Sequence, residues 1–248
     1  MLSKNQIKYI RLLNVKKNRK SLGVFVAEGP KVVGDLLRQS VPSMIFCTEE
    51  WASKNAVPDC PVNIITNQEL VKISFLQHPQ QVLAVFPIPE HNGAFPLSEL
   101  VLALDGIQDP GNLGTIIRIA DWFDISTIFC SHSTVDAYNP KVVQATMGSI
   151  AHVKVIYTDL EELIDNLPEG TPVYGTLLDG ENIYQKSLET HGVIVMGNEG
   201  NGISESLRQR INHRLLIPSF RDGDTAESLN VAIATAIACS EFRRKKYT

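Results

Sequence analysis

The sequence predicts an α/β protein in which a parallel sheet, covered by helices on both faces, follows a smaller α/β domain. Three observations lead to this prediction. Short apolar segments that read as strands alternate with helical segments along the whole chain. The strands are continuously apolar rather than alternating, as expected for a sheet covered on both faces. Residues 87–96 (PIPEHNGAFP) carry three prolines and a glycine without periodicity, so they read as a linker.

The composition agrees with two modest domains in a chain of 248 residues. Hydrophobic residues make up 44% and charged residues 20%, which is ordinary for a soluble globular protein. We place a first domain at residues 1–88, the linker at 89–97 and a second domain at 98–248.

The first part begins with a predicted helix at residues 3–14, where Ile7, Ile10 and Leu13 share one side. A basic turn at residues 16–20 follows it. The strands predicted in this part are 23–27, 44–47, 62–66 and 81–86. The further helices predicted here are 31–39 and 67–74, the second capped by Asn67.

The second part repeats the alternation after the linker, and we find no internal repeat. Its predicted strands are 100–104, 127–130, 153–156, 172–177, 193–196 and 213–218. Its predicted helices are 115–123, 139–149, 160–167, 204–209 and 229–242. The last helix is rich in alanine, which allows close backbone approach, and Ser228 or Thr225 is its expected cap.

Charge is unevenly distributed along the chain. Residues 1–40 carry nine basic and two acidic residues, a net charge of +7, whereas the whole chain carries −4 and the remainder therefore −11. A basic arm on an acidic body suggests a polyanionic partner, although a solvated helix face would give the same pattern. Because the cluster Lys16–Lys20 falls at a turn between a helix and a strand, we favour nucleic acid and expect Lys16, Lys17, Arg19 and Lys20 to contact RNA.

Several classes of protein are disfavoured by the sequence. The four cysteines are scattered without a CxxC pair, which argues against a disulfide framework or a zinc site and favours reduced cytoplasmic thiols. The first 20 residues lack the apolar region of a signal peptide, and no apolar run is long enough to span a bilayer. We therefore expect a cytoplasmic protein without a bound metal.

Three loops rich in glycine and small polar residues follow predicted strands, at 105–114, 197–204 and 219–228. Ligands collect at the carboxyl ends of strands in open α/β sheets, but each loop alone could be an ordinary turn. Residues 197–202 do not form GxGxxG and lack the lysine of a P-loop. A dinucleotide or nucleoside triphosphate is therefore poorly supported.

Taken together, these loops carry three ordered motifs. They are Asp109–Gly114 with Arg118 (DPGNLG…R), Val195–Ile203 (VMGNEGNGI), and Ile217–Pro218 followed by Ser228–Ala232 (IP…SLNVA). In this order they resemble the SpoU (TrmH) branch of the SPOUT RNA methyltransferases. The N-terminal part is similar to the L30e-like substrate-binding domain of that family through Ile7–Arg11, Lys16–Arg19 and Phe25–Gly29.

The resemblance implies S-adenosylmethionine (AdoMet)-dependent methylation of a ribose 2′-hydroxyl in rRNA or tRNA, with rRNA favoured. It also implies a sheet whose C-terminal segment is threaded as a trefoil knot, and a homodimer with the sites near its interface. Backbone groups of the knotted loops bind AdoMet in this family. The corresponding positions here lie around Leu177, Gly197, Ile217 and Leu229.

The resemblance assigns removal of the ribose proton to the arginine of the first motif, here Arg118. A guanidinium stays protonated at working pH, so we expect Arg118 to grip a phosphate while that phosphate or a water accepts the proton. Without the motif, Arg118 would read as a surface arginine paired with Asp121 and lying near Trp122.

Four further residues complete the expected catalytic set. Asn112, placed in the loop, would hold the motif or contact RNA, or only cap a helix. Glu199 would contact the ribose or orient Arg118, or be a solvated turn residue. Ser228 and Asn230 flank the start of the last helix, where exposed N–H groups favour a phosphate.

One departure from the family pattern and two rival functions stay open. Residues 219–227 make the third motif longer than usual, which leaves the path of this loop and the role of Arg221 undefined. The first rival is a non-catalytic RNA-binding or ribosome-assembly protein that retains the fold. The second is a nucleotide-binding oxidoreductase, which the missing GxGxxG argues against.

Overall fold

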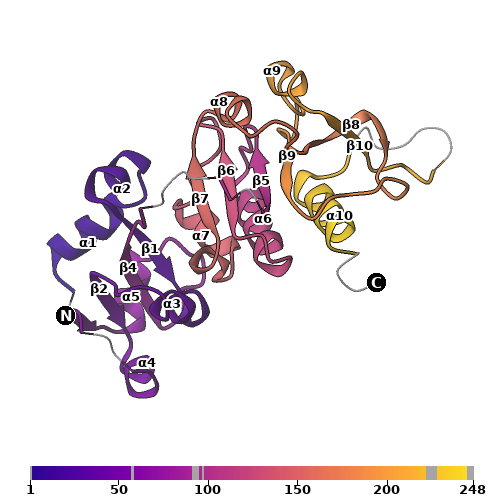
Figure 1. The fold of residues 1–248 in the computed structure, drawn as a ribbon. Helices are drawn as coiled ribbons and strands as arrows, with labels where there is room; N and C mark the ends of the chain where they lie inside the picture. Colours follow the sequence, from indigo (N-terminus) through magenta and orange to yellow (C-terminus); the bar gives the residue numbers. More distant parts are fainter. Residues whose placement is uncertain (1, 57–58, 91–94, 97, 222–227, 245–248) are drawn as a thin grey trace. The chain divides into compact units, whose positions relative to one another are not determined.

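The structure is a computed structural model that describes residues 2–56, 59–90, 95–96, 98–221 and 228–244. Two compact units divide the chain, and they are interleaved in sequence (Figure 1). The first unit contains residues 1–90 and 136–151, and the second contains residues 91–135 and 152–248. The predicted linker lies partly outside the described residues.

The first unit is built on a mixed four-stranded sheet in the order β1-β4-β2-β3. Its strands are β1 (Val24–Glu28), β2 (Met44–Cys47), β3 (Val62–Ile64) and β4 (Val82–Pro87). Strand β4 runs antiparallel to both β1 and β2, and β2 is parallel to β3. Every residue of β1 is buried, which explains why its sequence is apolar without alternation up to Glu28.

Helices cover both faces of this sheet. The helices from the N-terminal residues are α1 (Lys4–Leu12), α2 (Lys16–Leu22), α3 (Pro30–Leu37), α4 (Glu49–Lys54) and α5 (Asn67–Ile73). The later segment adds α7 (Pro140–Ala145) and a short 3₁₀ turn, η1 (Ser149–Ala151). One core joins Ile10 and Leu13 to Val24 and Val26 of β1. On the opposite side of β1, the ring of Phe25 lies 4.8 Å from that of Tyr138, next to α7.

Three predictions in the first unit are wrong in detail. The basic stretch 16–20 forms the body of helix α2 rather than a turn, because Lys and Arg are good helix formers. The helix ends only at Gly23, which has φ +65°. Helix α4 was not predicted. The N-cap of α5 is Thr66 and not Asn67. The Thr66 side chain accepts a hydrogen bond from the Glu69 N–H, and the Glu69 side chain accepts one from the Thr66 N–H, so the two residues form a capping box.

The second unit is a six-stranded sheet in the order β10-β8-β9-β5-β6-β7, and all its pairs are parallel. The α/β prediction with a parallel sheet is thus confirmed. The strands are β5 (Leu100–Leu104), β6 (Thr127–Cys130), β7 (Lys154–Tyr157), β8 (Val173–Asn182), β9 (Gly192–Met196) and β10 (His213–Leu216). Since β5 pairs with both β6 and β9, the direction of winding reverses at β5, and the carboxyl end of β5 is where a ligand is expected.

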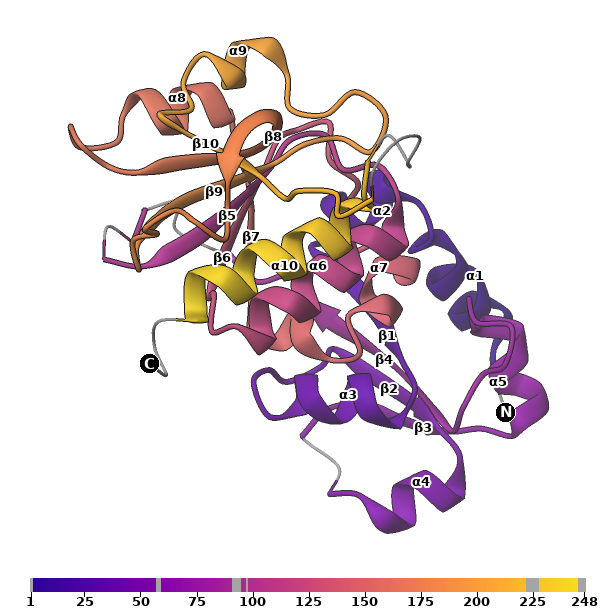
Figure 2. The ribbon, with the colours of Figure 1, turned by 90° about the vertical axis from the view of Figure 1, so that its right-hand side faces the viewer.

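The helices of this unit are α6 (Pro110–Trp122), α8 (Leu160–Asp165), α9 (Glu205–Arg208) and α10 (Val231–Arg244). Helix α10 packs along α6, which brings the end of the chain back to the first crossover after β5 (Figure 2). The core of the unit contains Val101, Phe129, Val195 and Leu207.

Element boundaries after residue 98 differ from prediction in four places. Helix α6 begins at Pro110, because Asp109 caps it and proline suits the first turn. Strand β8 continues to Asn182, with a break in register between Arg214 and Leu215 of β10. The predicted helix 139–149 is α7 followed by η1. Helix α10 starts at Val231 rather than at residue 229.

Candidate active site at the carboxyl ends of the parallel strands

The loops that follow β5 and β9 are joined side by side, as expected for neighbouring parallel strands. The Asp105 carboxylate accepts from the Ser204 N–H at 2.8 Å, and the Asn198 side-chain amide donates to the Gly106 carbonyl at 2.7 Å. Asn198 Oδ1 also accepts the N–H groups of Gly200 and Asn201, so it folds its own loop.

Gly197 lies where this folded loop is tightest. A Cβ at this position would lie 2.2 Å from the carbonyl carbon of Gly202 and 2.3 Å from the nitrogen of Ile203. Such distances are far inside van der Waals contact, so only glycine fits here without backbone movement. The second motif therefore presents backbone groups rather than a side chain at the end of β9.

Glu199 brings this loop to the start of helix α6. Its Oε1 accepts from Asn112 Nδ2 at 3.0 Å and from the Asp109 N–H at 3.4 Å, and its Oε2 accepts from the Gln108 N–H at 3.3 Å. A carboxylate at the amino end of a 13-residue helix is also favoured by the helix dipole. Burial raises the pKa of Glu199, but the hydrogen bonds from Asn112 and from backbone N–H groups outweigh it and leave the pKa below its ordinary value.

Asn112 links Glu199 to the third motif. Its Oδ1 accepts from Asn230 Nδ2 at 2.9 Å, and Asn230 Oδ1 in turn accepts from the N–H groups of Ala232 and Ile233. An ionised carboxylate only accepts hydrogen bonds. Glu199 therefore fixes which way the Asn112 amide faces, and Asn112 fixes the Asn230 amide. The predicted residues Asn112, Glu199 and Asn230 form one directional chain that joins all three motifs.

Two of the roles considered for these residues change. Asn112 lies inside α6, and Asp109 is the cap that accepts the Asn112 N–H at 2.8 Å. Asn230, and not Ser228, caps α10, so the polar residue at that helix start has a structural explanation. Ser228 is exposed. The alternative cap Thr225 lies outside the described residues.

For the methyl transfer that the motif resemblance implies, we expect Glu199→Gln to weaken the reaction about tenfold to a hundredfold, because an amide turns one donor toward N–H groups that need an acceptor. Since the folded pKa is lowered, the stabilisation by Glu199 is fully present above pH 4.5, its ordinary value, and disappears as the pH falls through the lower folded value. The thermal midpoints of the two proteins should therefore differ at neutral pH and converge in acid. Equal midpoints at neutral pH would contradict this role. Glu189→Gln, at another exposed glutamate, is the matched control.

Arg118 lies on α6, six residues or about 1.7 turns beyond Asn112, and it is exposed. The expected surface partner is otherwise engaged, because Asp121 pairs with His152 Nδ1 at 3.3 Å. Within the part of the chain that the structure describes, Arg118 makes no hydrogen bond or ion pair, and Glu199 does not reach it. Its guanidinium is thus exposed and takes no part in the polar contacts of the described residues, and its contact with a phosphate stays a prediction.

Two of the four positions expected around AdoMet directly follow a strand, one lies within a strand and one precedes helix α10. Leu177 is buried in β8, Gly197 follows β9, and Ile217 follows β10, which are neighbouring strands in the sheet. Leu229 precedes α10 and is 50% exposed. Next to Leu177, residues 176–180 bulge out of the pairing with β10, because Arg214 faces Gly175 while Leu215 faces Glu181.

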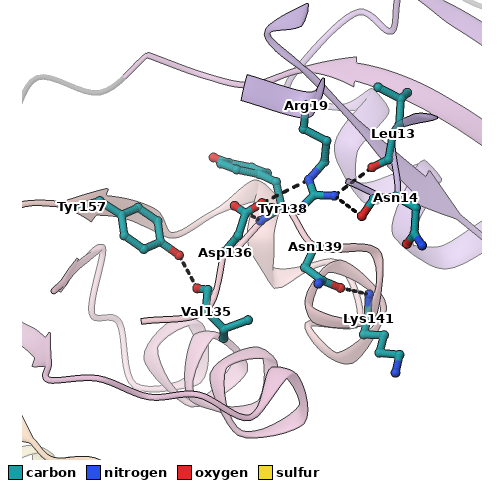
Figure 3. A network of polar contacts seen from close by, with 9 residues as sticks. All are labelled: Leu13, Asn14, Arg19, Val135, Asp136, Tyr138, Asn139, Lys141 and Tyr157. Atoms are coloured by element: carbon teal, nitrogen blue, oxygen red, sulfur yellow. Dashed lines mark hydrogen bonds and ion pairs between the residues drawn. The ribbon is translucent and has the colours of Figure 1, made fainter. Parts of the chain in front are cut away.

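The four predicted RNA-contacting residues do not share one environment. Lys16, Lys17 and Lys20 are exposed on α2. Arg19 is 1% exposed and pairs with Asp136, so the prediction that Arg19 itself contacts RNA is wrong, because its guanidinium is occupied inside the first unit (Figure 3).

Three polar residues of the site were not predicted. Asp105 and Asn198 tie the two loops together, and Asp109 caps the helix that carries Arg118. A signal existed for Asp109, which stands directly before a proline as helix caps often do. Asn198 stands inside the second motif, whereas Asp105 carried no signal beyond its position after a strand. No group of His, Cys, Asp and Glu residues suited to a metal ion occurs among the residues that the structure describes.

The chain is similar to known proteins over nearly its whole length. Residues 99–240 match the model of the SpoU rRNA Methylase family, and residues 4–84 match the MRM3-like substrate binding domain. The chain is 32% identical to the Bacillus subtilis 23S rRNA (guanosine(2553)-2′-O)-methyltransferase RlmP over 246 residues, which is 97% of each chain.

Two solved structures cover nearly the same length. A TrmH-family structure from Porphyromonas gingivalis superposes with a TM-score of 0.90 at 40% identity, over 99% of both chains. An AdoMet-bound rRNA methyltransferase from Sinorhizobium meliloti superposes with a TM-score of 0.88 at 31% identity, over 99% of this chain and 96% of that one.

Proposed function

Because the chain belongs to the SpoU rRNA methylase family, we propose that it transfers a methyl group from AdoMet to a ribose 2′-hydroxyl of ribosomal RNA. The observation that carries this proposal is the hydrogen-bonded chain Glu199–Asn112–Asn230, which unites the three family motifs. The rival reading, a non-catalytic RNA-binding protein, does not account for a complete motif set in which Arg118 makes no polar contact among the described residues.

The reaction needs alignment and assistance in removing a proton. AdoMet supplies an electrophilic methyl group on a sulfonium when it is bound. Charge is neutralised as the ribose oxygen attacks, and a pocket with little water favours that change. We assign to Arg118 the grip on a phosphate of the RNA, which aligns the hydroxyl and brings a phosphate oxygen or a water within reach of its proton.

The cofactor position that we propose is bounded by Leu177, Gly197, Ile217 and Leu229. The crowding at Gly197 supports it, since that loop offers backbone groups and leaves no room for a side chain. Ser228 and Asn230 stand at the start of α10, and we propose that Ser228 contacts the RNA there, while Asn230 holds Asn112.

The remaining expectations of the family pattern are part of the proposal. We propose that residues 1–88 bind RNA through Lys16, Lys17 and Lys20, that the segment leading into α10 is knotted, and that the protein acts as a homodimer in the cytoplasm. The exposed apolar side chains of Trp122, Leu229 and Ile233, on or beside the packed pair α6 and α10, support a dimer. None of the described helices is long and apolar enough to cross a bilayer.

The function is tested with purified protein, AdoMet labelled in its methyl group, and separate rRNA and tRNA substrates. We expect label in rRNA, and 2′-O-methylnucleoside on digestion of the product. AdoMet binding by calorimetry without transfer to either RNA would favour the non-catalytic alternative. Label in tRNA alone would retain the enzyme but overturn the substrate. The mass in solution, measured by light scattering, tests the dimer separately.

A further inference from the structure

Helix α2 has few means of its own to stay helical. It has seven residues, and isolated helices of that length are unstable in water. Its N-cap, Val15, makes no side-chain capping bond, and its first turn has no acidic residue. Lys16 and Lys17 instead lie at the positive end of the helix dipole, and Lys16 and Lys20 repel at a spacing of four. The helix must therefore be held by contacts with the rest of the unit.

Those contacts centre on Arg19, the one side chain that α2 buries. Its Nη1 donates to the carbonyl oxygens of Leu13 and Asn14, at 2.8 and 2.9 Å, at the end of α1. Its Nε and Nη2 both donate to Asp136 Oδ2, the Nε bond at 3.1 Å (Figure 3). Four donor contacts on a buried guanidinium fix the rotation and tilt of the helix that carries it.

Asp136 is itself held in place. Its Oδ1 accepts from the Tyr138 N–H at 3.1 Å, and Tyr138 packs against Phe25 of β1. Asp136 also lies in the segment between β6 and β7, which belongs to the first unit although both strands belong to the second. A carboxylate 117 residues away in sequence thus decides how α2 lies.

We propose that Asp136 is a positioning residue for RNA binding: through Arg19 it holds α2 so that Lys16, Lys17 and Lys20 meet the phosphates together. The inference rests on the proposed function in taking these three lysines as the RNA contacts. Lysine side chains on a fixed helix bind a polyanion as a set, and each phosphate contact adds both affinity and salt dependence.

The test is Asp136→Asn in the full-length protein, with binding to an rRNA fragment measured over a range of salt concentrations. We expect the Kd for RNA to rise about tenfold and the slope of log K against log salt to fall by about one, as for the loss of a phosphate contact. The AdoMet Kd should stay unchanged. Removing a negative charge would by itself tighten RNA binding, so weaker binding identifies lost positioning rather than lost charge.

Further variants and a second measurement sharpen the result. Hydrogen exchange should show residues 16–22 less protected in Asp136→Asn, and Asp136→Glu, which keeps the charge, should recover part of the affinity. The matched control is Asp165→Asn, which removes the charge and one of the two bonds of 2.8 Å to Arg210 in the second unit and should leave RNA binding as it is.

Three outcomes overturn the proposal. One is a folded Asp136→Asn protein with unchanged RNA affinity and salt slope. If that variant does not fold, Arg19→Met/Asp136→Leu replaces the pair by apolar groups, a change that buried ion pairs often tolerate. Failure of both to fold, or normal RNA binding by the double variant, also rejects the positioning role. The triple variant Lys16→Ala/Lys17→Ala/Lys20→Ala tests separately the premise that these lysines contact RNA. If it binds RNA normally, the proposed RNA contacts are wrong, whatever Asp136 does.

Discussion

Arg118→Ala is expected to lower methyl transfer to RNA by about 10²- to 10⁴-fold, the range that a group acting on proton transfer and alignment contributes. The side chain is exposed and makes no polar contact among the described residues, so its loss should cost the fold less than about 0.5 kcal/mol. AdoMet affinity should be unchanged. The measurement is single-turnover transfer of labelled methyl at saturating AdoMet and RNA.

The control for this prediction is Arg38→Ala. Arg38 is also an exposed arginine, at the end of α3, but it belongs to the first unit and pairs with Asp35. Its removal should leave the rate of the chemical step near that of the parent. Full activity in Arg118→Ala would contradict the role assigned to the first motif and return the non-catalytic alternative to consideration.

Gly197→Ala is the second change expected to have a large effect. The new methyl carbon would lie 2.2 Å from a backbone carbon, so the loop must move by more than a side-chain rotation. Because Glu199 belongs to this loop, displacement of the loop should also break the hydrogen bond between Asn112 and Glu199. We expect AdoMet binding to weaken at least a hundredfold, measured by calorimetry, with methyl transfer falling to match.

The same loop provides the comparison for this substitution. A Cβ at Gly200 would have its nearest neighbour at 3.6 Å, which is ordinary contact. Gly200→Ala should therefore bind AdoMet within a few-fold of the parent. If both alanine variants bind equally well, the crowding at Gly197 does not shape the cofactor site.

Much of the second unit could be predicted because its strands are short, apolar and bounded by turn residues. The helix start at Pro110 was missed because Gly111 and Gly114 are poor helix residues, and they read as a loop. Their helix is instead secured by the Asp109 cap and by packing on α10. Tertiary contacts outweighed local propensity there.

The parts of the site that could not be predicted depend on long-range contacts. Nothing near Arg19 in sequence indicates that it would be buried, since its partner is 117 residues away. A cluster of basic residues predicts exposed side chains, and Lys16, Lys17 and Lys20 are exposed. Asn230 likewise looked functional, because its capping role is visible only once the first residue of α10 is known. Helix boundaries are the feature that a sequence determines least well.

The interleaving of the two units bears on how this protein is made and on how it could be divided. When the first 90 residues leave the ribosome, Arg19 has no carboxylate to meet, and Phe25 lacks the ring of Tyr138. A buried charge without its partner costs about 3–5 kcal/mol, against a total stability of about 5–15 kcal/mol for a typical domain. The first unit therefore reaches its full stability only after residue 151 has been synthesised. A fragment that ends at residue 90 should therefore have a lower free energy of unfolding than a fragment that also carries residues 136–151.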